Sequence, residues 1–284
     1  MKLKFKQQGY QNEAVQSVVK CFEGQEKGSR KDLVGRYTRI VDAGTLLEKR
    51  EDIELIAYGN HPITLTETER RTNIRNVQKE NGINFTDKEP LSELTVEMET
   101  GTGKTYTYIK TMYELNKAYG WSKFIVIVPS IAIREGVQKS FEITQDHFLE
   151  EYHKKIRFFV YNSNNSSNIA NINTFASDNS IQAMIINYQA FNSTSAANKR
   201  IDMELDELQS RKPIDVINKV NPILIIDEPQ KIGEKTEQTL SKFKPLFTIR
   251  YSATHKTIYN LMYRLSPVDA CEQHLVKSIE VLYE

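Results

Sequence analysis

From residue 94 onward, short apolar runs alternate with segments of helical spacing, and this alternation predicts an α/β fold. Six of the runs are strand candidates, and the run FIVIV at 124–128 has the continuous apolar, β-branched character of a strand that is covered on both faces. The six candidates are residues 94–100, 121–130, 155–161, 181–188, 222–229 and 246–255. Helical patterns fall between them at residues 101–120, 131–147, 202–209 and 214–220. Strands that alternate with helices imply right-handed crossovers, so we expect a mostly parallel central sheet flanked by helices.

The other segments predict smaller features around this sheet. Residues 10–22 carry apolar side chains at helical spacing, with Asn12 as the expected N-cap. Residues 24–93 are mostly charged and polar, so we expect a small insertion that contains a hairpin or a short helix. The Asn- and Ser-rich segment 162–180 predicts a surface loop. Residues 258–265 have the pattern of a helix.

These features divide the chain into four expected regions. Residues 1–23 form an N-terminal helix, residues 24–93 the insertion, and residues 94–265 the main domain. Residues 266–284 are expected to begin a connection to a further domain, because the run 277–283 resembles a strand with no helix after it. A chain that ends in this way looks cut.

Composition narrows the function classes. The chain has 38 Lys and Arg against 37 Asp and Glu, a net charge of +1, which excludes a histone-like binder but leaves room for a local basic face. No run approaches the roughly 18 apolar residues that span a bilayer, and the N-terminus lacks signal-peptide character, so we expect a cytoplasmic protein with no membrane partner. Cys21 and Cys271 are far apart in sequence, which indicates neither a disulfide framework nor a zinc site.

The sequence METGTGKT at residues 98–105 is the most informative segment for chemistry. Gly101 and Gly103 would let successive backbone N–H groups turn inward around phosphate oxygens, at the N-terminus of the following helix. Lys104 would reach the β- and γ-phosphates, and the Thr105 hydroxyl would ligate magnesium. The match to the phosphate-binding pattern lacks the usual first glycine, because a methionine stands in that place.

Two further polar groups follow apolar strands. Asp227 and Glu228 come directly after the run 223–226, where the carboxyl end of a parallel strand faces the ligand crevice. Asp227 would hold magnesium through water, and Glu228 would orient and deprotonate the attacking water. Ser252 and Thr254 follow the next strand, and their hydroxyls could hydrogen-bond the acidic pair. The tyrosines at 106, 108 and 113 on the helix after the phosphate loop have the spacing of side chains that pack between helix and sheet, which we favour over base stacking.

Taken together, METGTGKT, DEPQ and SATH resemble, in this order, motifs I, II and III of superfamily 2 helicases. The particular residues of these motifs resemble those of the restriction (Res) subunit of type III restriction–modification enzymes. Residues 10–11 resemble the adenine-reading Q motif, 125–137 motif Ia, 186–192 the region called Ib, and 260–281 the segment that leaves the first motor domain.

The resemblance implies an ATP- and Mg²⁺-dependent RecA-like motor domain with the P-loop fold, from a DNA-translocating endonuclease subunit. Such subunits act with a methyltransferase (Mod) partner, which recognises the DNA sequence. In the family pattern, the strand that precedes DEPQ is expected beside the phosphate-loop strand. For Arg134, which the resemblance places near the DNA backbone, an exposed helix cation is an equally good explanation. The roles carried over are adenine contact by Tyr10 and Gln11, phosphate contact by Thr100, Gly101, Thr102, Gly103, Lys104 and Thr105, metal binding and catalysis by Asp227 and Glu228, coupling by Gln230, Ser252 and Thr254, and DNA-backbone contact by Pro129, Ser130 and Arg134.

Departures from the family pattern limit what this chain should do alone. The sequence after residue 255 has no match to the motifs of a second motor domain, and it has no nuclease constellation. An arginine supplied to the site in trans is worth about 10³–10⁵ in turnover, so we expect weak ATPase activity, weak DNA binding and no DNA cleavage. Two alternatives stay open. One is the motor of another superfamily 2 enzyme, such as a type I restriction enzyme, repair helicase or remodeller, and the other is a nucleotide switch without a nucleic-acid partner.

Overall fold

A seven-stranded parallel sheet forms the centre of the protein. The computed structural model describes residues 5–28, 34–41, 49–85, 88–161, 167–188, 200–205, 208 and 211–276. The strand order in the sheet is β5-β6-β4-β7-β8-β3-β9, and each pairing is parallel. The strands are β3 (Glu93–Met98), β4 (Lys123–Val128), β5 (Arg157–Tyr161), β6 (Gln182–Asn187), β7 (Ile223–Asp227), β8 (Thr248–Ser252) and β9 (Leu261–Leu265).

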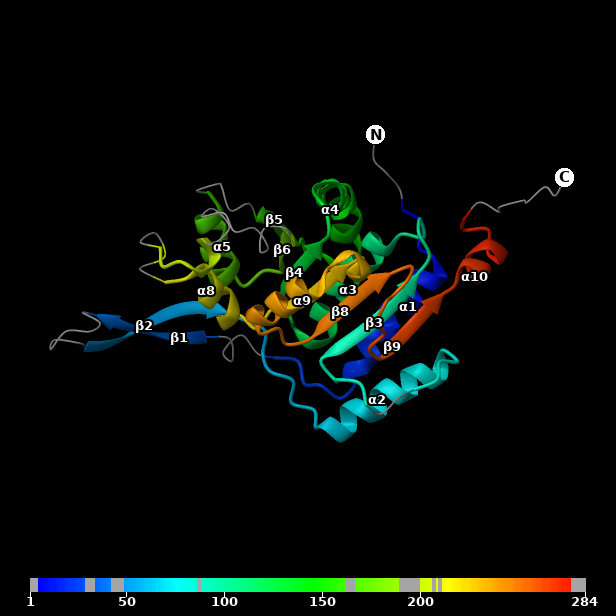
Figure 1. Ribbon diagram of the computed structural model, residues 1–284, viewed down its shortest axis with the longest axis horizontal. Coiled ribbons are helices and arrows are strands. Elements are labelled where there is room, and N and C mark those ends of the chain that lie inside the picture. The colour runs from blue at the N-terminus through cyan, green and yellow to red at the C-terminus, as the bar shows by residue number, and fades with distance from the viewer. Residues whose placement is uncertain are drawn as a thin grey trace.

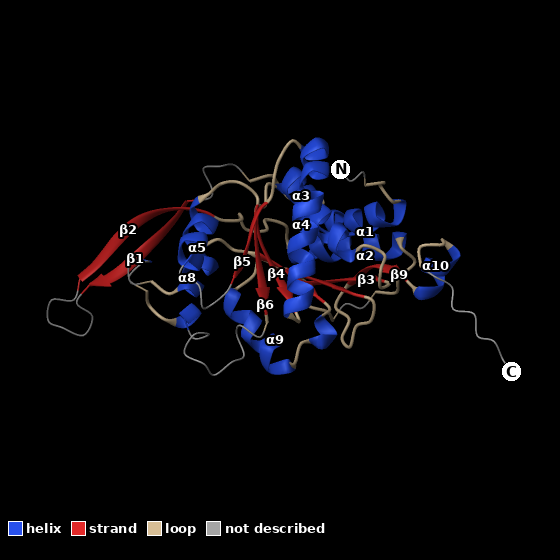
Figure 2. Ribbon diagram, turned by 90° about the horizontal axis from the view of Figure 1, so that it is seen from above, coloured by secondary structure: helices blue, strands red, loops and turns tan. Residues whose placement is uncertain are grey.

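Helices cover both faces of this sheet (Figures 1 and 2). On one face pack α1 (Gly9–Val19), α2 (Glu67–Glu80), α3 (Lys104–Tyr119) and α4 (Ile131–Tyr152). On the other pack α5 (Ser167–Ser177), α8 (Pro213–Lys219), α9 (Glu234–Leu240) and the 3₁₀ turn η6 (Ser241–Phe243).

The alternation of side chains along the strands divides the core into these two layers. In β4, Phe124 and Val126 join the core under α1 and α3, whereas Ile125 and Ile127 join the core under α5 and α8. Every residue of β4 is buried, which explains why the five residues after Lys123 are continuously apolar rather than alternating. The predicted α/β class with a mostly parallel central sheet flanked by helices is confirmed.

The strand order corrects one expectation. The DEPQ strand β7 does not lie beside the phosphate-loop strand β3, because β8 is inserted between them and pairs with both. The strand that ends in Ser252 is therefore in the middle of the site. Its central position also accounts for the burial of every residue in β8.

Two segments have a different structure from the one their sequence suggests. Residues 258–265, expected as a helix, contain the edge strand β9 instead, because a short apolar run fits either period and β3 offers a free edge for pairing. Part of the expected loop 162–180 is helix α5, whose Ile172 and Phe175 are buried one turn apart. The high Asn and Ser content masked this apolar spacing, and residues 162–166 lie outside the described residues.

Smaller corrections concern element ends. Helix α1 begins at Gly9 with Gln8 as its N-cap, not at Asn12. Helix α4 continues past the expected end near residue 147 to Tyr152. Of the stretch 202–209, expected as a helix, Asp202 ends the 3₁₀ turn η3 (Arg200–Asp202) and Leu205 forms an isolated bridge with Arg211, while residues 206, 207 and 209 lie outside the described residues. The expected strand at 277–283 lies outside the described residues.

Residues 24–93 contain both a hairpin and a helix. Strands β1 (Val34–Val41) and β2 (Lys49–Tyr58) form a separate antiparallel sheet, which extends away from the main body beside α5 and α8 (Figure 1). Helix α2 begins at a capping box formed by Thr66 and Glu69 and buries Ile74 and Val77 against the main core. The helix is therefore part of the packed domain, while the hairpin projects from it.

Other features of the fold are the 3₁₀ turns η1 (Lys20–Phe22) and η5 (Pro229–Lys231) and the short helix α10 (Pro267–Glu272). None of the helices in the described residues is long and apolar enough to cross a membrane.

Candidate functional site

The loop between β3 and α3 has the backbone that phosphate binding requires. Gly101 and Gly103 have φ angles of +82° and +88°. This left-handed region costs other residues about 1–2 kcal/mol, which explains the glycines. Gly103 is the N-cap of α3, so the loop leads directly into a helix N-terminus and its positive dipole end.

Two side chains of α1 hold this loop from the outside. The Tyr10 hydroxyl donates to the Thr102 carbonyl oxygen at 2.9 Å, and Gln11 Nε2 donates to the same oxygen at 3.0 Å. A Cβ at Gly103 would lie 2.5 Å from Gln11 Nε2, so a larger residue there would displace this amide from the Thr102 carbonyl. The residues that the resemblance assigned to adenine recognition are thus in direct contact with the phosphate loop.

Glu99 organises the loop from within, and sequence reasoning gave it no role. Its backbone carbonyl accepts from Thr102 Oγ1 at 2.6 Å, and its carboxylate accepts from the Thr100 N–H at 2.7 Å. The Thr102 side chain is buried by this contact, while Thr100 is exposed. Of the two threonines, Thr102 stabilises the loop and Thr100 lies at its surface.

Lys104 meets the acidic pair across the site. Its Nζ lies 3.1 Å from Glu228 Oε1 and also donates to the Met98 carbonyl oxygen at 3.3 Å. Glu228 follows the last residue of β7 with a φ of +54°, an unfavourable conformation for a non-glycine residue. This turn directs the carboxylate toward the lysine, so the carboxyl end of β7 and the start of α3 converge as the sequence predicted.

The two neighbouring carboxylates have opposite pKa shifts. Burial, reinforced by the charge of Glu228, raises the pKa of Asp227 to about 6 despite the opposing charge of Lys104. Burial also acts to raise the pKa of Glu228, but the hydrogen bond from Gln230 and the charge of Lys104 outweigh it, so this pKa is lowered. Glu228 is therefore charged at neutral pH, whereas Asp227 carries a charge that its surroundings do little to stabilise.

A hydrogen-bond network joins the residues expected to couple hydrolysis to movement. Gln230 Nε2 donates to Glu228 Oε2 at 2.5 Å, and the Ser252 hydroxyl lies 2.8 Å from Gln230 Oε1. The same hydroxyl lies 3.2 Å from Glu228 Oε2 and accepts from the Thr254 N–H at 3.1 Å. The ends of β7 and β8 are thus connected through side chains, which agrees with the predicted grouping.

The expected DNA-contacting residues follow β4 at the same edge of the sheet. Pro129 is buried, and the Ser130 hydroxyl caps α4 by accepting from the Ile133 N–H at 3.2 Å. Arg134 lies half-buried in the first turn of that helix. Strand β4 pairs with β7 on the side away from β8, so these three residues lie one strand beyond the acidic pair.

The donor set suits magnesium. A buried carboxylate with a raised pKa, a second carboxylate beside it and a hydroxyl at Thr105 are the hard oxygen groups that Mg²⁺ prefers. A divalent cation would also relieve the repulsion between Asp227 and Glu228 that contributes to this raised pKa. Thr105 and Asp227 would hold the ion, and the ion would neutralise charge on the β- and γ-phosphates.

One contact at the acidic pair was not expected from the sequence. Tyr108 packs between helix and sheet as predicted, but its hydroxyl also lies 3.5 Å from Asp227 Oδ2. The three-residue spacing from Thr105 to Tyr108, which places both on one face of the helix, could have indicated it.

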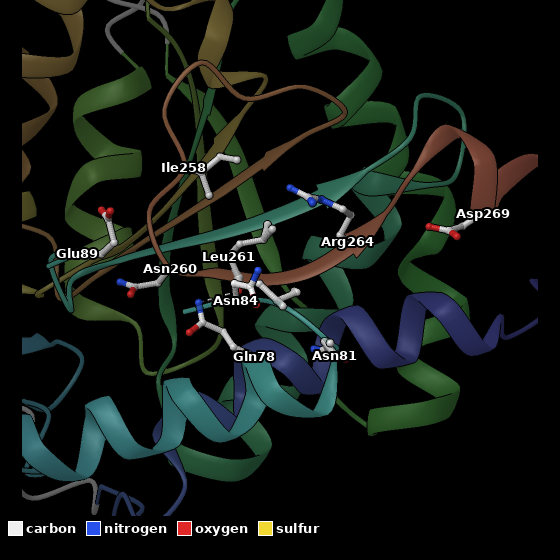
Figure 3. A pocket seen from close by; sticks show the side chains of 11 residues that line it. Gln78, Asn81, Asn84, Glu89, Ile258, Asn260, Leu261, Arg264 and Asp269 are labelled. Atoms are coloured by element: carbon white, nitrogen blue, oxygen red, sulfur yellow. Dashed lines mark hydrogen bonds between the residues drawn. The ribbon is translucent and has the colours of Figure 1, made fainter. Parts of the chain in front are cut away.

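A separate cavity of about 490 Å³ lies beside β9 and α2 (Figure 3). Three of the amide groups that line it donate hydrogen bonds to backbone carbonyls. Gln78 Nε2 donates to the Leu261 carbonyl, Asn81 Nδ2 to that of Met262, and Asn260 Nδ2 to that of Glu93. None of its lining residues belongs to the phosphate loop or the acidic pair. These contacts attach the edge strand to α2.

Comparison with known proteins identifies the family. A family model described as "Type III restriction enzyme, res subunit" matches residues 4–257. The chain belongs to this family. It is 36% identical over 251 residues to the EcoP15I Res subunit of Escherichia coli, covering 81% of this chain and 26% of that protein. It is 34% identical over 260 residues to the EcoPI Res subunit of Escherichia phage P1, covering 84% of this chain and 26% of that protein.

This member of the Res family spans about a quarter of the length of these curated relatives. Among solved structures it is similar to a nuclease-deletion mutant of the type ISP restriction–modification enzyme LlaGI, with a TM-score of 0.42 and 14% identity over 75% of this chain and 21% of that one. The UvsW helicase of bacteriophage T4 gives a TM-score of 0.39 and 13% identity over 75% of this chain and 63% of that one. The predicted resemblance to type III Res subunits is confirmed by the family match.

Proposed function

We propose that this domain binds ATP with magnesium at the phosphate loop and hydrolyses it, as the N-terminal motor domain of a type III restriction enzyme. The observation that carries the proposal is the 3.1 Å approach of Lys104 Nζ to Glu228 Oε1, at a loop whose two glycines have positive φ angles. The buried carboxyl of Asp227 lies next to Glu228, and this grouping supports Lys104 as a phosphate-binding cation, Asp227 as a metal ligand and Glu228 as a general base.

The proposed roles follow from the surroundings of each side chain. Backbone N–H groups of the loop and Lys104 bind the phosphates. Tyr10 and Gln11 contact the adenine of ATP, and their hydrogen bonds to the Thr102 carbonyl connect the adenine site to the loop. Asp227 and Thr105 hold Mg²⁺. Glu228 accepts a proton from the attacking water, which its lowered pKa permits because it stays ionised at neutral pH.

A structural change caused by ATP hydrolysis can be transmitted to the rest of the enzyme through the hydrogen-bond network at Asp227 and Glu228. Gln230 and Ser252 both contact the Glu228 carboxylate, and Thr254 is tied to Ser252. A change in the position of Glu228 during turnover would therefore be transmitted to the ends of β7 and β8. We propose that this coupling drives movement on DNA, and that Pro129, Ser130 and Arg134 contact the sugar-phosphate backbone of the DNA.

The activities of the whole enzyme are proposed from the family. They are DNA translocation, DNA cleavage and action with a methyltransferase (Mod) subunit. The 284-residue polypeptide by itself should hydrolyse ATP slowly, because an arginine supplied in trans raises the turnover of such motors by a factor of about 10³–10⁵. It should also bind DNA weakly and not cleave it.

The test separates binding from hydrolysis with two variants. Lys104→Ala should weaken binding of a fluorescent ATP analogue, because the phosphates lose a charged hydrogen-bond donor worth about 1.5–3 kcal/mol. Glu228→Gln should retain binding but slow single-turnover hydrolysis by about 10²–10⁴. Lys117→Ala, at an exposed position near the other end of α3, is the matched control. Unchanged binding by Lys104→Ala would refute the proposal.

A further inference from the structure

A fully buried tyrosine lies beside the two side chains proposed to hold magnesium. Tyr108 lies in α3 with no solvent exposure, and its hydroxyl is 3.5 Å from Asp227 Oδ2. The side chain of Thr105 also acts on this hydroxyl, where its hydrogen bonding opposes the rise in the Tyr108 pKa that burial causes. Residues three apart on a helix share a face, so α3 itself places Thr105 and Tyr108 together. The Tyr108 hydroxyl therefore lies on the core-facing side of Asp227 and Thr105.

The position of Tyr108 is fixed by the strand inserted between β7 and β3. Its ring packs edge-on against the ring of Tyr251 in β8, with centroids 5.5 Å apart. Tyr251 is the strand partner of Asp227, and its own hydroxyl is 3.0 Å from that of Thr111, one turn further along α3. Both tyrosines are fully buried, so neither hydroxyl can turn to solvent.

We propose that Tyr108 is a positioning residue that orients Asp227 and Thr105 as ligands of magnesium. By donating to Oδ2 of Asp227, the hydroxyl restrains the carboxylate and leaves Oδ1 for the ion or its water. Hydrogen-bond partners of metal ligands act in this way in other sites, and their removal costs about 10–100-fold in metal affinity. The inference rests on the proposed function, because it supposes a magnesium nucleotide at this site.

The two neighbouring tyrosines allow a matched experiment. Tyr108→Phe removes the hydroxyl at Asp227, and Tyr251→Phe removes an equally buried hydroxyl that is bonded to Thr111 instead. Binding of a fluorescent ATP analogue is measured while Mg²⁺ is titrated, and again in EDTA. Tyr108→Phe should raise the Mg²⁺ concentration for half-maximal enhancement of binding by about 10–100-fold, with no change in EDTA. Tyr251→Phe should give the wild-type Mg²⁺ curve.

The outcomes separate this inference from the proposed function. If the wild-type protein binds the analogue with Mg²⁺ and Tyr108→Phe has the same Mg²⁺ curve, the positioning role is wrong while the proposed function stands. Equal shifts for both phenylalanine variants would also overturn it, because they would show a general loosening of the core. If the wild-type protein does not bind the analogue at all, the proposed function itself fails. Circular dichroism melts in EDTA verify that each variant is folded.

Discussion

At the scale of single residues, two adjacent carboxyl groups have different environments, which supports the different roles proposed for them. Asp227 is the last residue of a central strand and is 5% exposed, whereas Glu228 turns outward to meet Lys104 and Gln230. The sequence assigned the two acids to metal and water respectively. The structure adds a physical reason, because a buried, poorly stabilised carboxylate benefits most from a cation.

The raised pKa of Asp227 predicts that this residue destabilises the protein without a cation. A folded-state pKa of about 6, against an ordinary 3.8, means that the folded protein binds the proton more tightly than the unfolded chain. The unfolding free energy should therefore fall as pH rises from about 4 to 6, and it stays lower above that. Asp227→Asn should raise it at pH 8 by about 1–3 kcal/mol, with a smaller gain toward pH 4, in urea denaturation with EDTA.

Glu228→Gln is the control for this prediction, because the pKa of Glu228 is shifted in the opposite direction. A lowered folded-state pKa contributes stability above the ordinary value, so this variant should lower the unfolding free energy at pH 8. Destabilisation by Asp227→Asn at pH 8 would show that its carboxylate is already satisfied in the nucleotide-free protein.

At the scale of elements, helix α2 completes the edge of the sheet. Its Gln78 and Asn81 amides donate to the carbonyl oxygens of Leu261 and Met262, at the start of β9 (Figure 3). The segment that was expected to be an insertion thus supplies side chains that attach an edge strand. A strand edge with unpaired polar groups is otherwise open to incorrect pairing.

Gln78→Glu tests this attachment, because it keeps the side-chain shape but replaces the donor with a charged acceptor that faces a carbonyl oxygen. The side chain is 3% exposed, so we expect a loss of about 1–3 kcal/mol in the unfolding free energy at pH 7. Asn76→Asp, the same chemical change at an exposed position of α2, should leave it within about 0.5 kcal/mol. Equal effects of the two changes would mean that the amide of Gln78 does not stabilise β9.

Most elements could be predicted from the sequence because their patterns are long or continuously apolar. Strands β4, β6 and β7 and helix α3 are of this kind. The edge strand β9 could not, because its apolar run is too short to distinguish two periods without knowledge of its partner β3. Helix α5 was missed because composition was given more weight than the spacing of its apolar residues.

At the scale of the whole molecule, the strand order places two expected binding regions on one edge of the sheet. The phosphate loop follows β3, and residues 129–134 follow β4, with the ends of β7 and β8 between them. The side-chain network of Glu228, Gln230 and Ser252 occupies this intermediate position. Nucleotide and nucleic acid would therefore be connected through the two strands inserted between their sites.

Arg134→Ala tests the proposed nucleic-acid side of this edge. If Arg134 contacts one phosphate, its removal should weaken binding to DNA of any sequence and reduce the slope of log K against log salt by about 1. Lys139→Ala, at an exposed position further along α4, is the matched control and should leave the slope unchanged. Fluorescence anisotropy with short duplexes at several salt concentrations measures both. Salt-independent or undetectable DNA binding by the wild-type protein would favour a nucleotide switch.

The sequence by itself determined the class of fold and the residue types that form the candidate site. Glycines that tolerate positive φ, a lysine and a hydroxyl before a helix, and acids after an apolar strand are local features that follow from backbone conformation and side-chain chemistry. Only the tertiary structure decided which strands are neighbours, and so placed β8 between the phosphate loop and the acidic pair. It also brought the Tyr108 hydroxyl to Asp227 and the amides of α2 to β9. Such contacts join residues far apart in the chain, and their geometry depends on packing that no local pattern specifies.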